Sequence, residues 1–218
     1  MELPQSIFLV FGATGRTGRH FVDIALEEGH RVKALVRSPG KVRRQHANLE
    51  LVEGSVADDE HLDELLQGVD AVICMLGNAR EQSKNLVNTA FFKKLIPAMR
   101  RQGVKRLLYQ AGGFTRPYKR NLPLASRILK SVLLRPAGLL GQHRDNEAVI
   151  EYLVEEAQDI DWTVHRASIT SDGPSKGTAQ RHRTKFSLLT FEDCARYNYR
   201  LLSDDSAIHT YDLSRYGG

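Results

Sequence analysis

A glycine-rich heptapeptide near the N-terminus constrains the fold of this chain more than any other feature. Residues 12–18 read GATGRTG, which places three glycines in a GxxGxxG pattern. A short apolar run, residues 6–11, precedes the glycines, and a helical stripe of apolar residues follows them as far as Gly29. Strand, glycine turn and helix in this order are typical of the first unit of a Rossmann-type fold.

Short apolar runs alternate with helix-length amphipathic segments along the rest of the chain. We expect strands at residues 6–11, 30–37, 49–52, 70–76, 104–110, 161–167 and 207–213. We expect helices after the glycine turn and at residues 59–67, 84–102, 143–158 and 191–202, with Pro97 kinking or dividing the third. This order predicts an α/β fold with a doubly wound, mostly parallel sheet and helices on both faces.

The length and composition are those of one ordinary domain. The chain has 218 residues, of which 41% are hydrophobic and 26% charged, and these values exclude a disordered chain. We therefore expect residues 1–218 to form a single NAD(P)-binding domain, with a small substrate-side region from loops 112–135 and 168–187. The only cysteines, Cys74 and Cys194, form no metal or redox motif, so we expect buried thiols. No apolar stretch is long enough to span a membrane, and we expect a cytoplasmic protein.

The glycine spacing indicates the chemistry of the first turn. One glycine permits the sharp turn, the next lets the backbone approach a pyrophosphate, and the last lets helix and strand pack closely. The helix start then offers N–H groups to the phosphates, and the hydroxyls of Thr14 and Thr17 are further donors. The sequence thus predicts dinucleotide binding by this turn, at Gly12, Thr14, Gly15, Arg16, Thr17 and Gly18.

The end of the second expected strand indicates which dinucleotide is bound. NAD-dependent proteins usually place a carboxylate there for the ribose 2′-hydroxyl. This chain has Arg37 followed by Ser38, and Arg16 adds a second cation. Because a guanidinium can bind a 2′-phosphate through paired hydrogen bonds, we predict NADP(H) as the cofactor. The alternative is that Arg37 is only an exposed charge at a strand end.

Charge is distributed unevenly along the chain. Residues 82–144 contain fourteen lysines and arginines and no acidic residue, although the net charge of the whole chain is only +5. Such a segment favours an anionic ligand, a protein partner or an anionic surface, but a solvated basic face explains it equally well. No helix-turn-helix or RNA-binding motif accompanies the charge, so we expect no nucleic-acid partner.

Several segments also resemble a known family. GATGRTG, LVR at 35–37, GSVAD at 54–58 and DAVICMLG at 70–77 resemble the atypical short-chain dehydrogenases/reductases with NmrA-like folds, and among them the biliverdin reductase B (flavin reductase) group. The likeness covers nearly the whole chain and is more specific in its first half. It implies further cofactor-binding positions at Ser55, Val56, Leu76, Gly77, Asn78, Gln110, Ala111, Ala167, Ser168 and Ile169.

The chain departs from this pattern at the expected proton donor. No tyrosine is followed by a lysine four residues later, and Ala111 occupies the position after the fifth strand where relatives often have a serine. His143 falls where relatives place a Lys or His near the nicotinamide ribose, and we consider it as the acid. A ribose-side or surface hydrogen bond is the alternative role. The pattern resembles enzymes that leave the chemistry to the cofactor.

Two loops at the carboxyl edge of the sheet are candidate substrate elements. Arg116, Tyr118 and Lys119 follow the fifth strand, where substrates bind in this architecture, and residues 168–185 could form a lid. A solvated loop is the alternative. The sequence favours an NADPH-dependent reductase acting on a small planar anion of flavin, tetrapyrrole or quinone type. The rival is a non-catalytic NmrA-like redox sensor that binds NADP(H) and acts through a protein partner.

Overall fold

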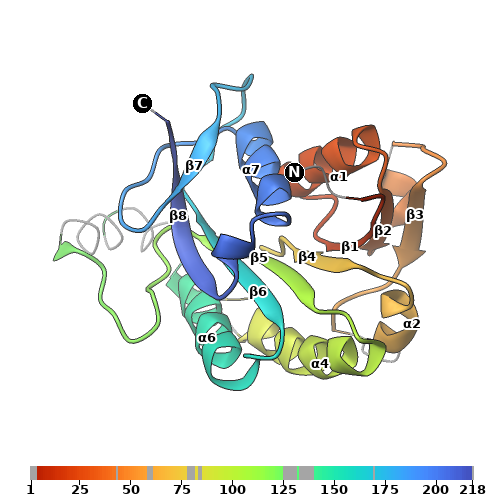
Figure 1. The fold of residues 1–218 in the computed structure, drawn as a ribbon, viewed down its shortest axis with the longest axis horizontal. Helices are drawn as coiled ribbons and strands as arrows, with labels where there is room; N and C mark the ends of the chain where they lie inside the picture. The colour runs from red at the N-terminus through yellow and green to blue at the C-terminus, as the bar shows by residue number, and fades with distance from the viewer. Residues whose placement is uncertain are drawn as a thin grey trace.

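A single mixed sheet organises the molecule. The computed structural model describes residues 4–42, 44–57, 61–77, 82, 85–124, 132, 140–168 and 170–217. Within these residues, eight strands form one sheet in the order β3-β2-β1-β4-β5-β6-β8-β7 (Figure 1). The strands are β1 Ile7–Phe11, β2 Arg31–Val36, β3 Leu49–Glu53, β4 Ala71–Cys74, β5 Arg106–Gly112, β6 Asp161–Ala167, β7 Ala179–His182 and β8 Thr210–Tyr216. All pairings are parallel except that of β7 with β8.

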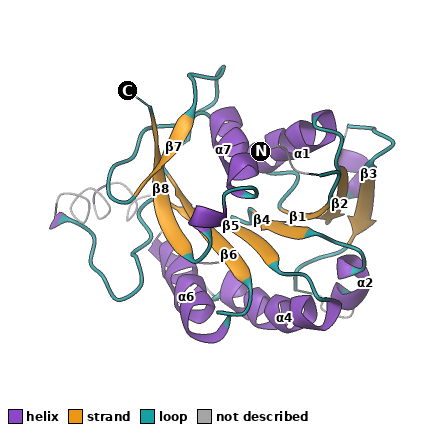
Figure 2. Cartoon of the chain, in the orientation of Figure 1, coloured by secondary structure: helices purple, strands orange, loops and turns teal. Residues whose placement is uncertain are grey.

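Helices cover both faces of this sheet (Figure 2). They are α1 Arg16–Glu27, α2 Leu62–Leu66, α4 Val87–Gln102, α6 Leu140–Glu156 and α7 Phe191–Leu201, with 3₁₀ turns at Pro39–Lys41 and Asp205–Ala207. α1 and α7 pack together on one face, and α4 packs with α2 and α6 on the other. The expected doubly wound α/β fold is confirmed.

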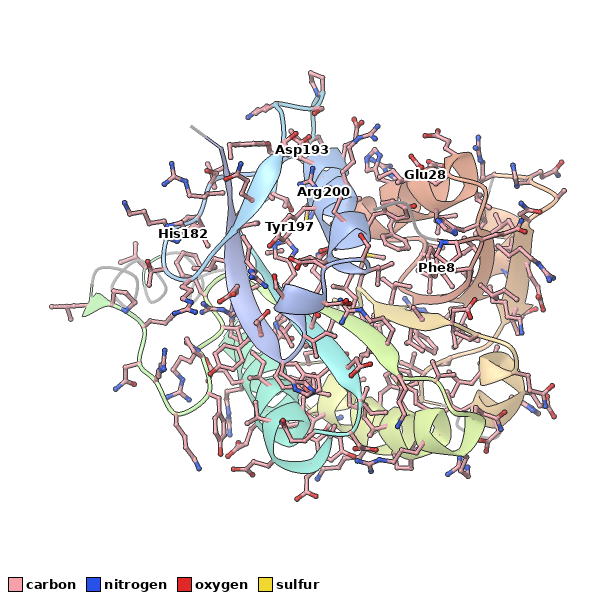
Figure 3. All side chains as sticks on the ribbon, viewed as in Figure 1. Phe8, Glu28, His182, Asp193, Tyr197 and Arg200 are labelled. Atoms are coloured by element: carbon pink, nitrogen blue, oxygen red, sulfur yellow. The ribbon has the colours of Figure 1, made fainter. Side chains whose placement is uncertain are left out.

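Two hydrophobic cores follow from this layering. Phe8 and Tyr197, both labelled in Figure 3, belong to the core under α1 and α7. Leu107 and Tyr109 of β5 belong to the core under α4 and α6, whereas Leu108 between them faces α1 and α7. Strands buried on both faces explain why the sequence shows continuous apolar runs rather than alternation.

Some elements differ from the sequence-based expectation. β7 lies inside the segment expected to be a lid, and β8 begins at Thr210, because residues 205–207 form a 3₁₀ turn. Pro97 lies within α4, which continues to Gln102 without dividing. α6 begins at Leu140, three residues before the expected start. None of these differences changes the order of the sheet.

The remaining structural expectations concern cysteines, metals and membrane spans. Cys74 and Cys194 are both free and buried, and burial raises the pKa of each thiol to about 12. The described residues contain no cluster of three or more His, Cys, Asp or Glu side chains able to hold a metal ion. None of the helices in the described ranges combines the length and apolar character needed to cross a membrane.

Candidate functional site

The loop between β1 and α1 has no room for side chains at two of its glycines. Gly12 has φ +88°, and a Cβ there would lie 2.6 Å from the Met75 carbonyl oxygen at the end of β4. A Cβ on Gly18 would lie 2.0 Å from the Gly12 carbonyl oxygen. The glycines therefore let α1, the loop and β4 approach more closely than any other residue would allow. This is the close packing that the motif predicts.

The first turn of α1 presents its backbone amides to the loop. Gly15 is the N-cap residue and has no side chain to cap the helix, while Thr14, Gly15 and Arg16 are exposed. Uncapped first-turn amides and the positive end of the helix dipole favour an anion. Thr17 is oriented differently, because its side chain is buried and its Oγ1 accepts a hydrogen bond from Gln110 Nε2 at 3.5 Å. Its contribution to a phosphate site would come from the backbone N–H.

The neighbouring helix start, at α4, is already capped by a carboxylate. The fully buried Asp145 of α6 accepts hydrogen bonds from the Asn88 and Thr89 backbone N–H groups, both at 2.9 Å, and from Gln82 Nε2 at 2.9 Å. Thr89 Oγ1 donates a further bond at 2.8 Å. Since this internal carboxylate satisfies α4, the anion site at this edge of the sheet belongs to α1. Asp145 is not among the residues predicted from the sequence, and its buried neighbours on α6 include the polar His143 and Asn146.

A cleft of about 270 Å³ opens between these two helix starts. It brings together eight of the residues predicted to bind the cofactor: Gly12, Thr14, Gly15, Arg37, Ser55, Val56, Leu76 and Gly77. The cleft lies where the sheet order reverses, since β1 pairs with β2 on one side and β4 on the other. Crevices at this position bind nucleotides in doubly wound folds. The described residues that line it include an arginine and no carboxylate, which suits a phosphate.

The two cations predicted to favour a 2′-phosphate lie in different environments. Arg37 is exposed and lines the cleft beside Gly54 and Ser55, and Ser38 next to it is half-buried. The Arg16 guanidinium instead stacks over the Phe191 ring of α7, 4.3 Å from its centroid. Arg37 is therefore the cation that lines the cleft, while Arg16 links the phosphate loop to α7.

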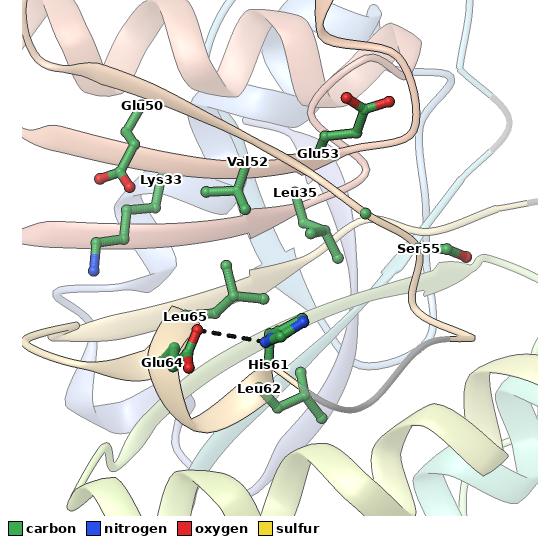
Figure 4. Close-up of a pocket in the computed structure, with 11 residues that line it drawn as sticks. Lys33, Leu35, Glu50, Val52, Glu53, Ser55, His61, Leu62, Glu64 and Leu65 are labelled. Carbon is green, nitrogen blue, oxygen red and sulfur yellow. Dashed lines mark ion pairs between the residues drawn. The ribbon is translucent and has the colours of Figure 1, made fainter.

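A second hollow adjoins the cleft and has a different character (Figure 4). It measures about 370 Å³ and shares Leu35, Gly54 and Ser55 with the cleft. Leu35, Val52 and Leu65 give it an apolar floor, whereas Glu50, Glu53 and Glu64 stand around it, the last 3.4 Å from His61 Nδ1. With three carboxylates against one lysine, Lys33, the charge around this hollow disfavours a phosphate, whereas the cleft offers Arg37 and no carboxylate among its described lining residues.

The predicted nicotinamide-side residues lie at the carboxyl ends of β5 and β6. Ala111 is buried, paired in register with Arg166, and Gly112 pairs with Ala167. Gln110 turns its amide toward α7, where its Oε1 accepts a bond from Asn198 Nδ2 at 2.7 Å. Ser168 is buried, and its hydroxyl donates to the Ser187 carbonyl. The predicted positions Asn78 and Ile169 fall outside the described residues.

His143 lies directly beneath the end of β5. It is 5% exposed, and its Nδ1 is 3.2 Å from Thr115 Oγ1. A Cβ on Gly112 would lie 2.6 Å from His143 Cε1, so the imidazole occupies space that only a glycine at position 112 leaves free. The structure thus places His143 in the interior, close to the strand end where the nicotinamide is expected, and not on the surface.

Tyr109 is a core residue. Its hydroxyl is 3.1 Å from Asn88 Nδ2 and 2.7 Å from the Asn146 side-chain amide, and burial raises its pKa well above the usual value. The ring packs against Phe92 under α4 and α6. A phenol in this position cannot exchange a proton with a ligand in the cleft.

The three predicted substrate residues pair with α6 instead of facing the cleft. Arg116 binds Glu147 through its backbone N–H at 3.1 Å and its Nε at 2.8 Å. The Tyr118 hydroxyl donates to Glu155 at 2.5 Å, and Lys119 Nζ lies 3.9 Å from the same carboxylate. These contacts neutralise much of the positive charge of Arg116 and Lys119, so the two side chains offer a substrate anion less charge than their sequence positions suggest.

The segment expected to form a lid is anchored to α7. Asp193 accepts hydrogen bonds from Ser175 Oγ at 2.5 Å, from the Lys176 N–H at 2.8 Å and from the Tyr216 hydroxyl at 2.6 Å. Burial would raise the pKa of Asp193, but these hydrogen bonds outweigh it and lower the pKa. Thr190 caps α7 by accepting a hydrogen bond from the Asp193 N–H at 3.0 Å.

Comparisons with known proteins identify the family. A family model described as NAD(P)H-binding matches residues 12–205, nearly the whole chain. The chain belongs to this NAD(P)H-binding family. Its members' cofactor fits the cleft described above, where the glycines leave room for a pyrophosphate beside the free start of α1.

Curated relatives match only part of this chain. A probable pinoresinol-lariciresinol reductase 3 of Arabidopsis thaliana is 30% identical over 106 residues, covering 44% of the chain and 35% of the relative. The photosystem II assembly factor Ycf39 of Synechocystis is 32% identical over 104 residues, covering 46% of the chain and 32% of the relative. The chain thus spans about a third of the length of these relatives.

Solved structures resemble the fold over almost its full length. The oxidoreductase ylbE of Lactococcus lactis has a TM-score of 0.79 at 20% identity, over 97% of this chain and 91% of that one. ChuY, an anaerobillin reductase of Escherichia coli O157:H7, has a TM-score of 0.75 at 16% identity, over 96% of this chain and 97% of that one. A short-chain dehydrogenase/reductase of Veillonella parvula in complex with NADP has a TM-score of 0.75 at 12% identity, over 99% of this chain and 96% of that one. At these identities the likeness establishes the Rossmann-type fold.

Proposed function

We propose that this NAD(P)H-binding protein is an NADPH-dependent reductase that transfers hydride to a small planar acceptor. The observation that carries the proposal is the cleft between α1 and α4, which combines a glycine-lined phosphate turn with Arg37 and no carboxylate among its described lining residues. The bound cofactor supplies the hydride. The reductase names of a curated relative and of one neighbouring structure, and the oxidoreductase name of another, support the same reaction class.

Cofactor choice follows from the groups at the end of β2. Arg37 stands where NAD-dependent relatives of this fold place an acidic residue, and the acidic side chains Glu50, Glu53 and Glu64 lie in the adjoining hollow. A 2′-phosphate beside Arg37 gains charge-assisted hydrogen bonds. We therefore propose NADP(H) over NAD(H), with Ser38 as a neighbouring donor.

The side chains around the expected nicotinamide site are suited to binding and positioning the cofactor and the acceptor, and less to exchanging protons with them. Ala111 has no functional group, Tyr109 is buried in the core, and His143 is 5% exposed beneath Gly112. A reductase built this way suits an electron-poor, conjugated acceptor whose reduced form takes its proton from solvent. Flavins, tetrapyrroles and quinones have this character. His143 remains our candidate for a weak acid or for holding the strand end near the ribose.

The test is NADPH oxidation against flavins, quinones and linear tetrapyrroles. We expect turnover with at least one conjugated acceptor, and slower turnover with NADH. A His143→Gln variant with unchanged kcat and an unchanged pH profile would restrict His143 to packing. Absence of NADPH oxidation with all three acceptor classes, by protein that binds NADPH, would contradict the reductase assignment.

A second candidate function is a redox sensor that binds NADP(H) without turnover and acts through a protein partner. The residue favouring it is Ala111, which supplies no hydroxyl at the strand end. The relative named as an assembly factor carries a non-enzymatic name. A sensor requires unequal affinity for NADP+ and NADPH, because only differential binding can shift a conformational equilibrium. Equal dissociation constants for the two forms would exclude it.

Three finer assignments also stay predictions. The first is membership of the NmrA-like subgroup, with the strongest resemblance to the biliverdin reductase B group. The second is that residues 1–218 form a single domain, and the third is a cytoplasmic location. Of the predicted substrate-side loop 112–135, the structure describes residues 112–124 and 132. A protein partner or anionic surface at the basic segment 82–144 would suit the sensor better than the reductase.

A further inference from the structure

A groove of about 650 Å³ begins directly beyond the end of β5. Three segments form its walls: residues 113–123, the turn after β7, and the first half of β8. His182, labelled in Figure 3, marks the side of the molecule on which it lies. Gly113, at its inner end, packs so closely on β6 that a Cβ there would lie 2.8 Å from the Ala167 carbonyl oxygen. The groove therefore starts where the proposed nicotinamide site ends.

A buried arginine joins the three walls of this groove. Arg166 is 2% exposed, and its guanidinium donates hydrogen bonds to three backbone carbonyls. Tyr211 of β8 accepts at 2.8 Å, Thr115 after β5 at 3.0 Å, and Arg183 after β7 at 3.3 Å. Each carbonyl belongs to a different wall, so this one side chain fixes the shape of the groove.

The positive charge of Arg166 is not neutralised by a contact. In the described part of the chain no carboxylate forms an ion pair with Arg166, and the nearby Asp212 pairs with Arg181 Nε at 3.7 Å. Burial lowers the pKa of Arg166 to about 10, which still leaves it charged at neutral pH. Asp212 offsets part of this charge, but a buried cation whose hydrogen bonds go to backbone carbonyls still creates a positive potential in the cavity beside it.

Two further arginines stand at the rim. Arg120 and Arg183 are both exposed and both line the groove, and neither has a carboxylate partner among the described residues. The described lining holds four arginines and one carboxylate. This differs from the Arg116–Lys119 stretch, whose cations pair with Glu147 and Glu155.

Aromatic side chains give the groove an apolar wall. Phe114 is 5% exposed and packs with Leu122 in a small cluster separate from the two main cores. Phe186 is 39% exposed, and its ring centroid is 6.1 Å from that of Phe114. An exposed aromatic ring next to unpaired guanidinium groups provides surface for a flat ring that carries an acidic group.

We propose that this groove holds the acceptor, with a flat conjugated ring against Phe114 and Phe186 and an attached phosphate or carboxylate bound by Arg120 and Arg183 above the buried charge of Arg166. The inference rests on the proposed reductase function, because it places the acceptor next to the nicotinamide end of the cleft. It assigns anion recognition to residues other than Arg116, Tyr118 and Lys119.

The test compares ligands that differ only in their acidic group. FMN and riboflavin share one ring system and differ by a phosphate, and biliverdin and its dimethyl ester differ by two carboxylate charges. Equilibrium binding of each ligand to the NADP+-loaded protein is measured by fluorescence quenching for the wild type and for Arg120→Gln/Arg183→Gln. Lys185→Gln is the matched control, since it removes one charge from the same loop but does not line the groove.

We expect the wild type to bind the charged member of at least one pair at least tenfold more tightly than its neutral partner. The double variant should lose most of this preference, while its affinity for the neutral ligand and for NADPH stays the same and Lys185→Gln keeps the preference. A preference for FMN over riboflavin would indicate a phosphate site, and a preference for biliverdin over its dimethyl ester would indicate a carboxylate site. Equal binding within both pairs, or a preference that survives in the double variant, would overturn the inference. A preference without NADPH oxidation would instead contradict the reductase function and leave the anion site standing.

Discussion

Gly12, Gly15 and Gly18 tolerate an added Cβ to very different degrees. At Gly15 the nearest atom would be 3.1 Å away, whereas at Gly18 the Gly12 carbonyl oxygen would be 2.0 Å away. At Gly12 both the positive φ and the Met75 carbonyl oppose any side chain. The motif therefore matters most at its first and last glycines, where backbone meets backbone.

Gly18→Ala is expected to force α1 away from the loop and to weaken NADPH binding at least tenfold, because the amide donors move off the phosphate. Gly40→Ala is the control, since a Cβ at Gly40 would meet nothing within 4 Å. Calorimetric titration with NADPH measures both variants. If Gly18→Ala does not fold, Gly15→Ala provides a milder test. Normal affinity in every variant would mean that the turn does not hold the cofactor.

Protonation of His165 should make the free energy of unfolding depend on pH. It is fully buried between Asn198 Oδ1 at 2.6 Å and Ser214 Oγ at 2.8 Å, and burial lowers its pKa to about 4. Between this value and the ordinary 6.5, the unfolded chain binds a proton that the folded protein does not. The free energy of unfolding should therefore fall as the pH drops from 6.5 to 4, by up to about 3 kcal/mol.

Urea denaturation of wild type and His165→Gln between pH 7.5 and 4.5 checks this expectation. The variant should lose much of the pH dependence, whatever its absolute stability. His30→Gln is the comparison, because burial also lowers the pKa of His30, although the charge of Glu28 partly offsets this effect. An identical pH slope in wild type and His165→Gln would contradict the assignment.

At the scale of elements, a network of hydrogen bonds between polar side chains connects α7 to α1. Asn198 of α7 contacts His165 of β6 and donates to Gln110 Oε1 of β5 at 2.7 Å, and Gln110 Nε2 donates to Thr17 of α1 at 3.5 Å. This hydrogen-bond network thus joins the carboxyl ends of β5 and β6 to the first turn of α1. No sequence pattern showed that these residues meet.

Asn198→Ala is expected to remove the partner of His165 Nδ1 and the amide donor to Gln110 Oε1, and to lower the free energy of unfolding by about 2 kcal/mol or more. Asn48→Ala, at a half-buried turn position before β3, is the control. Thermal denaturation and NADPH titration together measure the effect. Stability within error of the wild type would show that the network contributes little.

The elements themselves divide into those that the sequence could predict and those that it could not. β4, α1 and α7 follow from apolar runs, glycine stops and the Thr190 cap. β7 consists of Ala179, Gln180, Arg181 and His182, which carry no alternation and form a strand only because β8 offers an edge. Asp145 was missed for a similar reason, because its partners on α4 are more than fifty residues away.

At the scale of the whole molecule, the carboxyl edge of the sheet carries two regions of different charge pattern. The cleft at the α1 end was predictable, because the glycine turn, Arg37 and residues 54–56 each follow a strand that a local pattern reveals. Two walls of the groove at the β8 end fall within the predicted substrate-side loops 112–135 and 168–187, but the β8 wall and the buried arginine were not predicted. Arg166 reads as an ordinary strand residue, and its carbonyl partners at Thr115 and Tyr211 are distant in sequence. Long-range contacts of this kind decide where the acceptor would bind.

The choice between NADPH and NADH depends on Arg37 and is measured by calorimetric titration. We expect a dissociation constant for NADPH at least tenfold below that for NADH. Arg37→Gln should remove most of the difference, whereas Arg31→Gln, at the opposite end of the same strand, should leave it intact. Equal binding of NADPH and NADH by the wild type, or binding of neither, would contradict the account.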